Sequence, residues 1–249
     1  IIANTTMFQQ GNLSQLNPAN NLLKLAKSSG NSWAQKTLSE YPSKRIFHSI
    51  VFDSINLQFV LYGGQTNLGR DEETWAYNVS ANIWINKNPS SPPSGRFQHE
   101  MAYDNQNGII IMFGGQKQGG ITGETWSYNL SGNIWTNMNP GVSPLGRIGH
   151  SMIYDTNTKL VFLFGGKNST TNLDDTWVYN YTANNWTRYY PSVSPSARTF
   201  ASMSYNSDMN SIILFGGESK NDVWIYNTSV NNWTFMNTIT KPSTRSFHK

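Results

Sequence analysis

The sequence predicts an all-β protein built from four-stranded antiparallel sheets, with one sheet for each copy of an internal repeat. Three markers recur in phase along the 249 residues: a double glycine every 51 residues, an arginine twelve residues after a tryptophan, and two tryptophans nine residues apart. Self-similarity at a fixed period is the signature of a repeat architecture. Asn, Gly and Pro separate the short apolar segments, which favours strands over helices.

The markers fall at regular positions in four complete copies. The double glycines are Gly63 and Gly64, Gly114 and Gly115, Gly165 and Gly166, and Gly216 and Gly217. The repeat arginines are Arg45, Arg96, Arg147, Arg198 and Arg245. The tryptophan pairs are Trp75 and Trp84, Trp126 and Trp135, Trp177 and Trp186, and Trp224 and Trp233. The last arginine step is 47 residues instead of 51, so the final copy is short, and its deletion lies in the segment ESKND after Gly217.

Each copy contains four expected strands. In the copy that begins near Arg147 they are IGHSMIYD (148–155), KLVFLFGG (159–166), DTWVYN (175–180) and NNWTRYY (184–190). The second strand is almost continuously apolar, which indicates burial on both faces between neighbouring sheets. The glycines that end it permit positive φ and a close backbone approach. We expect the tryptophan and tyrosine rings to fill the gaps between adjacent sheets.

These features resemble the kelch repeat. Each copy has four apolar residues, a Gly-Gly pair, and then a tyrosine and a tryptophan separated by six residues. The Tyr and Trp pairs are Tyr77 and Trp84, Tyr128 and Trp135, Tyr179 and Trp186, and Tyr226 and Trp233. A kelch unit of about 50 residues forms one blade of a β-propeller. The resemblance therefore implies a kelch-type β-propeller with four-stranded antiparallel blades.

We interpret residues 1–249 as a single propeller of five blades. The expected segments are a degenerate three-stranded blade at 1–38, blades at 39–89, 90–140, 141–191 and 192–238, and the start of a closing strand at 239–249. The C-terminal strand would complete the degenerate blade, so that the ring has no exposed sheet edge between its ends. Six or seven blades become the alternative if the sequence is a piece of a longer protein.

Composition excludes several classes of protein and site. Charged residues make up only 13% of the chain, and the 18 Lys and Arg residues are scattered, so the net charge of +4 does not form the basic stripe that nucleic-acid binding needs. No apolar run approaches the ~18 residues of a membrane-spanning helix. The chain has no Cys, which excludes disulfides and thiolate sites.

The repeat-equivalent polar residues have a structural and a functional interpretation. The four histidines, which lie three residues after a repeat arginine, are His48, His99, His150 and His248. They could form a ring of metal ligands, but we favour buried histidines, because equivalent side chains spaced around an axis do not converge to the ~2 Å of a metal bond. The acids two residues before each first tryptophan are Glu73, Glu124, Asp175 and Asp222. We expect them to pair with the repeat arginines, with a ring of ligand-binding arginines as the alternative. No metal and no cofactor is predicted.

Functional residues are expected where the copies differ. The segments after the glycine pairs are QTNLGRDEE, QKQGGITGE, KNSTTNLDD and ESKND, and the Pro-rich links are NPSSPPSG, NPGVSPLG and YPSVSPSA. In propellers of this type such loops gather on one face, where partners bind. The candidate binding residues are Arg70, Asp71, Glu72, Lys117, Lys167, Arg188, Tyr189 and Tyr190. Loops carry function in aggregate, and each residue alone is more often solvated surface.

Nine N-x-[ST] sequons indicate glycosylation. They begin at Asn4, Asn12, Asn78, Asn129, Asn168, Asn180, Asn185, Asn227 and Asn232. The alternative is that Asn serves the backbone in turns, since four of these residues directly follow the repeat tyrosine. Combined with the low charge, the sequons favour an extracellular or cell-surface glycoprotein. The lack of Cys fits a microbial or archaeal surface protein, a setting in which similar kelch arrays occur.

Three classes of function remain. We favour a non-catalytic propeller that binds a protein or a glycan, or that joins other subunits of a surface assembly. The second class is a carbohydrate-active enzyme that resembles sialic-acid mutarotase and uses Arg and Glu in the propeller channel; the copper oxidases of this family need a cysteine that the chain lacks. The third is an intracellular adaptor. Because fold does not fix function, the first choice rests on family analogy.

Overall fold

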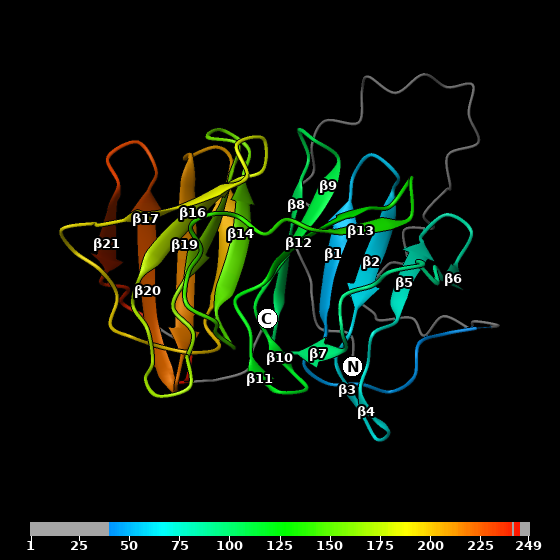
Figure 1. Ribbon diagram of the computed structural model, residues 1–249. Coiled ribbons are helices and arrows are strands. Elements are labelled where there is room, and N and C mark those ends of the chain that lie inside the picture. Colours follow the sequence, from blue (N-terminus) through cyan, green and yellow to red (C-terminus); the bar gives the residue numbers. More distant parts are fainter. Residues whose placement is uncertain (1–39, 241, 245–249) are drawn as a thin grey trace, which may run out of the picture.

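The computed structural model describes residues 40–240 and 242–244, and in this part of the chain it contains strands and turns only (Figure 1). The all-β prediction is confirmed. No helix capable of spanning a membrane occurs among these residues. The expected degenerate blade at 1–38, the sequons at Asn4 and Asn12, and Arg245 and His248 of the expected closing strand lie outside the described residues. The number of blades therefore stays a prediction.

The described chain forms four antiparallel sheets of four strands. The first contains β1 (Ser49–Asp53), β2 (Gln58–Tyr62), β5 (Thr74–Asn78) and β6 (Ile83–Asn86). The second contains β8 (Glu100–Asp104), β9 (Ile109–Phe113), β12 (Thr125–Asn129) and β13 (Ile134–Asn137). The third contains β14 (Ser151–Asp155), β15 (Leu160–Phe164), β16 (Thr176–Asn180) and β17 (Asn185–Tyr189). The fourth contains β18 (Ser202–Asn206), β19 (Ser211–Gly217), β20 (Lys220–Asn227) and β21 (Asn232–Met236).

Five very short strands complete the described elements. They are β3 (Gln65–Thr66), β4 (Gly69–Arg70), β7 (Arg96–Phe97), β10 (Gln116–Lys117) and β11 (Gly120–Ile121). β3 pairs with β4, and β10 pairs with both β7 and β11. All five lie together at the lower edge of the sheets in Figure 1.

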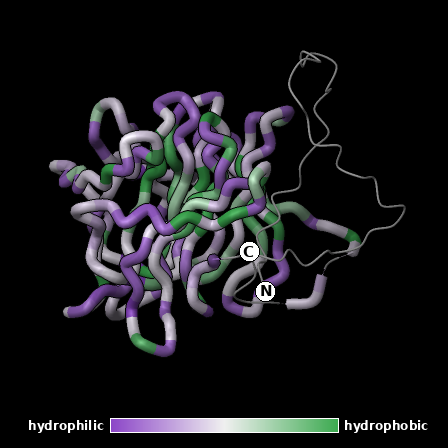
Figure 2. The backbone as a smooth tube through the Cα atoms, turned by 90° about the vertical axis from the view of Figure 1, so that its right-hand side faces the viewer, coloured by the Kyte–Doolittle hydropathy of each residue, from purple (hydrophilic) through white to green (hydrophobic). Residues whose placement is uncertain are grey.

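The first strands of the four sheets lie innermost. β1 contacts β8, β8 contacts β14, and β14 contacts β18, whereas the fourth strand of each sheet is an outer edge. The circle is narrow, because the ring of Phe47, just before β1, lies 6.4 Å from the ring of Phe200, just before β18. The sheets are therefore arranged around an axis as propeller blades. Hydrophobic chain segments lie mostly inside the molecule, and hydrophilic ones in most loops (Figure 2).

In the second, third and fourth blades, the second tryptophan of the pair fills the gap to the preceding blade, as expected. Trp186 is 1% exposed and its ring lies 5.0 Å from that of Phe113 in the preceding sheet. Its Nε1 donates to Oγ1 of Thr125, also in the preceding sheet, at 2.9 Å. The equivalent ring contacts and indole hydrogen bonds join Trp135 to Tyr62 and Thr74, and Trp233 to Phe164 and Thr176. A wide apolar ring with one satisfied N–H suits a position between two stacked sheets.

In the second, third and fourth blades, the first tryptophan of the pair differs from this expectation, whereas Trp75 of the first blade is buried. Trp126, Trp177 and Trp224 are only half-buried at the edge of the core clusters. Their Nε1 atoms donate within the same blade, for example from Trp177 to Oδ2 of Asp175 at 2.7 Å. In these three blades the two rings of a pair therefore serve different purposes, and the second acts as the wedge between blades.

A tyrosine and an asparagine close the turn between the third and fourth strands. Tyr179 pairs with Trp186 across the strands, and its hydroxyl donates to Oδ1 of Asn184 at 2.8 Å. Asn184 has φ 47°, a left-handed conformation that Asn tolerates well. Its Nδ2 donates to the carbonyl of Met138, which belongs to the repeat before, at 2.7 Å. One asparagine thus shapes the turn and ties neighbouring repeats together.

The short final repeat has its deletion where the sequence placed it. β19 runs through Gly217 and continues into β20 through a turn at Glu218 and Ser219, which have φ 47° and 60°. Positive φ at both central residues is the geometry of a type I′ hairpin turn. The tight hairpin replaces the longer loops of the other repeats.

We predict that Thr125→Val lowers the free energy of unfolding by about 1–3 kcal/mol, because it leaves the buried indole N–H of Trp186 without an acceptor. Urea denaturation followed by tryptophan fluorescence measures the change. Thr136→Val, on the exposed side of β13, is the matched control and should stay within about 0.5 kcal/mol of wild type. Equal stability of the two variants would contradict the wedge assignment.

Candidate functional site

The repeat arginines hold the loops that follow the second strands, through hydrogen bonds to an acid and to a glycine carbonyl. Arg147 donates to both carboxylate oxygens of Asp175, at 2.6 and 2.9 Å, and to the carbonyl of Gly165 at 2.9 Å. Arg198 binds Asp222 and Gly216 in the same way. The expected pairing is present, and it lies within each repeat. Bidentate pairs of this kind fix orientation as well as charge.

The other two repeat arginines that the structure describes also bind carboxylates, but in other arrangements. Arg96 donates to Oε2 of Glu124 at 2.7 Å, and Lys117 binds the other oxygen of the same carboxylate. Arg45 binds two acids, Glu73 at 2.8 Å and Asp71 at 3.1 Å. Burial raises the pKa of the Glu124 carboxyl, but the hydrogen bonds from Lys117, Arg96 and Trp126 outweigh it and hold the pKa at about 2.

The double glycines allow neighbouring repeats to contact each other beside the repeat arginines. Gly64 N–H donates to the carbonyl of Arg96 in the next repeat at 2.8 Å. Gly63 has φ 63°, and a Cβ there would lie 2.6 Å from the same carbonyl oxygen, so no other residue fits. His99 is fully buried beside this glycine and lies edge-on to the ring of Tyr62. The buried interpretation of the repeat histidines is confirmed for His99 and His150.

The variable loops and the Pro-rich links share one face, which we call the loop face. It comprises residues 65–73, 116–124, 167–175 and 218–222 together with 88–95, 139–146 and 190–197. Links and loops touch directly, since Ser143 Oγ donates to the carbonyl of Gly123 at 3.3 Å, and Ser194 Oγ donates to the carbonyl of Asp174 at 3.2 Å. Each link therefore lies against the loop of the repeat before it.

The structure divides the candidate residues of the first loop. Arg70 is exposed, and its guanidinium carbon lies 5.6 Å from the ring centre of Phe97. Asp71 is held in the fold, with a side chain 13% exposed, an ion pair to Arg45 and a hydrogen bond from the N–H of Glu73. Glu72 is exposed. Only Arg70 and Glu72 present their charges to solvent.

The other candidates are spread across the face. Lys117 is bound to Glu124, while Lys167 is exposed beside its backbone bridges to Ile148 and Asn172. Arg188, Tyr189 and Tyr190 lie at the end of the outer strand β17. The guanidinium of Arg188 lies 5.0 Å from the ring centre of Tyr190, which is 75% exposed. The candidates form separate groups instead of one cluster.

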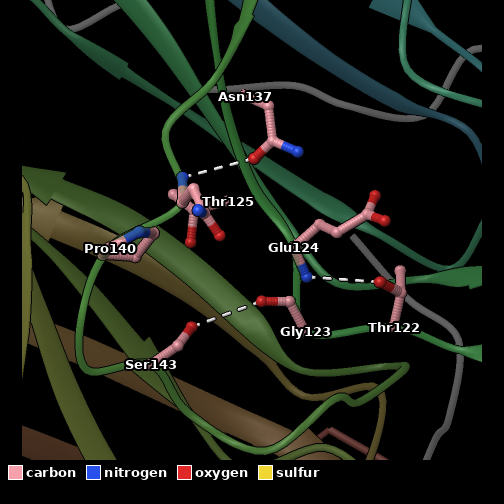
Figure 3. A pocket seen from close by; sticks show the side chains of 8 residues that line it. Thr122, Gly123, Glu124, Thr125, Asn137, Pro140 and Ser143 are labelled. Atoms are coloured by element: carbon pink, nitrogen blue, oxygen red, sulfur yellow. Dashed lines mark hydrogen bonds between the residues drawn. The ribbon is translucent and has the colours of Figure 1, made fainter.

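A small polar hollow lies on the loop face of the second blade (Figure 3). Its volume is about 220 Å³, and it is lined by Thr122, Gly123, Glu124, Thr125, Asn137, Asn139, Pro140 and Ser143. Small-molecule sites usually occupy about 300–1,000 Å³ and are mostly apolar. No group of three or more His, Asp or Glu side chains able to hold a metal lies within residues 40–240 and 242–244.

Sequence reasoning missed the aromatic residues near the axis. Phe47, Phe97 and Phe200 come from three repeats, and the ring of Phe47 lies 6.3 Å from that of Phe97 and 6.4 Å from that of Phe200. The available signal was the variation next to the repeat arginines, where RIF, RFQ, RIG and RTF differ in the second and third positions.

The sequons lie largely on the opposite face. Asn129, Asn180 and Asn227 are exposed at the ends of the third strands, which begin at the loop face and run away from it. Asn78 lies at the same place in the first blade, and Asn185 begins the fourth strand of the third blade there. Two of the described sequons differ: Asn168 lies in a variable loop, and Oδ1 of Asn232 accepts from the N–H of Val193, in a Pro-rich link, at 3.0 Å. The Oδ1 of Asn129 accepts from the N–H of Gly132 at 2.7 Å, so this asparagine also shapes its turn.

Comparison with known proteins identifies relatives of the repeat. A model described as the KLHDC2/KLHL20/DRC7 Kelch-repeats domain matches residues 3–217. Mei4-dependent protein 6 of Schizosaccharomyces pombe is 26% identical over 136 residues, which are 50% of this chain and 19% of that protein. Kelch domain-containing protein 10 of Xenopus laevis is 28% identical, over 56% of this chain and 36% of that protein. The tRNA wybutosine-synthesizing protein 4 of Emericella nidulans is 29% identical, over 63% of this chain and 15% of that protein. The chain thus spans between 15% and 36% of the length of these relatives.

We predict that Glu124→Gln destabilises the protein by about 1–3 kcal/mol at neutral pH, because Arg96 and Lys117 lose their charged acceptor. The folded-state pKa of about 2 lies below the ordinary value of 4.5. The pair therefore stabilises the fold fully above about pH 4.5, and this contribution is lost as the pH falls toward 2. Denaturant midpoints of both proteins at pH 7, 4 and 2 should converge at the lowest pH. A difference that is independent of pH would refute the assignment.

Proposed function

The chain belongs to the Kelch-repeat family, and from that premise we propose that it is a non-catalytic propeller that binds a partner protein through its loop face. The observation that carries the proposal is the division between repeated and variable side chains. Groups that recur in every repeat, such as Arg147 with Asp175 and Trp186 with Thr125, are bound to each other inside the fold. The exposed charged side chains that differ between repeats, such as Arg70 and Lys167, lie on the loop face.

The geometry favours binding over catalysis. General acid–base chemistry needs a titratable group that can reach a substrate. The repeat carboxylates are engaged by arginines, and His99 and His150 are buried between blades. The name of one relative refers to tRNA wybutosine synthesis, and that activity belongs to that protein. A panel of sugars assayed by NMR for anomer exchange tests the mutarotase-like alternative, and catalysed exchange by the purified chain would overturn the proposal.

We further propose an extracellular or cell-surface location with glycans on the face opposite the loops. The support is the position of the sequons. Because Oδ1 of Asn129 and of Asn180 accepts a backbone hydrogen bond of the turn, Nδ2 is the atom left for a glycan. Glycans there would leave the loop face open to a protein or glycan partner or to other subunits of a surface assembly. An intracellular adaptor would lack such modification.

Loop replacement tests the binding face. In the variant, residues 66–69 and 117–120 are each replaced by Glu-Ser, the two-residue turn that the last repeat already uses at 218–219. We expect wild type to capture at least one specific protein from cells of its source, and the variant to retain less than a tenth of it. The matched control is Ile55→Ser with Leu57→Ser, two exposed residues on the opposite face. Retention of every captured protein by the loop variant would refute the proposed face.

Intact mass of the protein isolated from its source tests the location. Secretion with glycosylation predicts a mass above the 28.0 kDa of the polypeptide, with the added mass on peptides that contain Asn129, Asn180 or Asn227. Asn139, an exposed asparagine outside any sequon, is the internal control. Unmodified peptides at all three sequons would contradict the glycoprotein proposal and leave the binding proposal untouched.

A further inference from the structure

The second blade carries an Asn-Gly pair in the turn between its first two strands. Asn107 and Gly108 lie between β8 and β9, and Asn107 is exposed. The equivalent pairs of the other blades are Asn56 and Leu57, Thr158 and Lys159, and Met209 and Asn210. Nowhere else in the 249 residues does a glycine directly follow an asparagine.

A glycine after an asparagine makes the side-chain amide chemically labile. The backbone nitrogen of the next residue can attack the amide carbon Cγ, and glycine has no Cβ to obstruct the approach. In this turn a bond forms between the nitrogen of Gly108 and Cγ of Asn107, and the amide nitrogen leaves as ammonia with the proton of the Gly108 N–H. The product is a succinimide ring. Water then opens the ring at either carbonyl and gives Asp or isoaspartate.

The attacking group is available in the folded protein. In the third blade the N–H at this position, that of Lys159, donates to the carbonyl of Asp155 at 2.8 Å. The N–H of Gly108 donates to no acceptor within residues 40–240 and 242–244. The nucleophile of the second blade is therefore not engaged in the turn.

The first blade provides an internal comparison. Nδ2 of Asn107 donates to Oδ2 of Asp104 at 2.7 Å, and its N–H donates to Oδ1 at 3.2 Å. Asn56 makes the same two hydrogen bonds to Asp53, at 2.8 and 3.0 Å. The residue that follows also has positive φ in both turns, 66° at Gly108 and 54° at Leu57. The two asparagines thus share their local restraints and differ in the side chain of the next residue.

The turn lies beside both neighbouring blades. A Cβ on Gly108 would lie 3.1 Å from Cδ1 of Ile55 in the first blade. Asp104 is 1% exposed, and burial together with this neighbouring carboxylate raises the pKa of the Tyr154 hydroxyl in the third blade. The strand that follows the turn, β9, is buried along its whole length. A change in the turn therefore acts on the core of the second blade and on its contacts with both neighbours.

We propose that Asn107 is a site of spontaneous deamidation, and that the modification lowers the stability of the propeller as the protein ages. The product has no Nδ2 to donate to Asp104, and its new carboxylate lies beside a buried one, where like charges repel. Isoaspartate also adds a methylene to the backbone of a turn that aligns Asp104 with Ile109. Both changes oppose the pairing of β8 with β9. The site is independent of the proposed function.

Ageing of the purified full chain tests the chemistry. The protein is incubated at 37 °C and pH 8, samples are digested at acidic pH, and the peptides are followed by mass spectrometry. We expect the peptide with Asn107 to gain about 1 Da, and to do so about 10-fold faster than the peptide with Asn56. Labelling with an isoaspartyl methyltransferase distinguishes isoaspartate from Asp. Equal rates at the two asparagines would overturn the proposal.

Two reciprocal variants isolate the effect of the glycine. Gly108→Asn installs the residue that the fourth blade has at this position, where φ is 45°, and should slow the reaction of Asn107 about 10-fold. Leu57→Gly places a glycine after Asn56 and should accelerate its reaction about 10-fold. Leu57 is 63% exposed, so this variant gives the same test if Gly108→Asn does not fold. Unchanged rates in both variants would overturn the role of the glycine.

Asn107→Thr is the matched control for stability. Thr158 holds this position in the third blade, and its Oγ1 donates to Oδ2 of Asp155 at 2.8 Å in place of an amide. After ageing, the modified fraction of wild type should melt about 3–6 °C below fresh protein, whereas Asn107→Thr should keep its melting temperature. An equal loss in both proteins would overturn the effect on stability. An Asn107 that stays unmodified throughout would overturn the inference as a whole.

Discussion

In each described blade after the first, one indole ring packs against the blade before it. Trp135, Trp186 and Trp233 contact an aromatic ring of the preceding sheet, and each donates Nε1–H to a threonine there. The distance between two neighbouring sheets therefore depends on the size of the tryptophan side chain between them. Because the ring is nearly flat and almost fully buried, a smaller residue would leave a cavity between two sheets, and cavities of this kind destabilise proteins strongly.

Polar side chains of the repeat bind backbone groups that become buried where two sheets pack together. Where the sheets approach each other, backbone groups must be satisfied without water. The guanidinium of Arg147 donates to the carbonyl of Gly165, and Nδ2 of Asn184 donates to the carbonyl of Met138. The arginine is neutralised in turn by Asp175, so that a buried charge is paired. The charged groups of the repeat, which could otherwise take part in a reaction, therefore stabilise the fold.

Apart from the acids that pair with the repeat arginines, the residues of the loop face vary between repeats. The sequence identified Arg70, Glu72 and Lys167 as residues of this face, and the structure places all three there, exposed. It did not show that Asp71 and Lys117 are bound in ion pairs, because their partners Arg45 and Glu124 already had other expected roles. It also could not reveal Phe97 beneath Arg70, since the two belong to different repeats and meet only through blade packing.

The sequence by itself determined the period, the four strands of each blade, the buried second strands and the pairing of arginines with acids. These follow from local patterns that recur in phase, and repetition multiplies a weak local signal. Only the tertiary structure decided which tryptophan of each pair enters the gap between blades, and that Phe47, Phe97 and Phe200 meet at the axis. The reason is physical: a repeat pattern is the same in every blade, whereas a contact around an axis joins residues about 50 to 150 positions apart, and no local pattern encodes it.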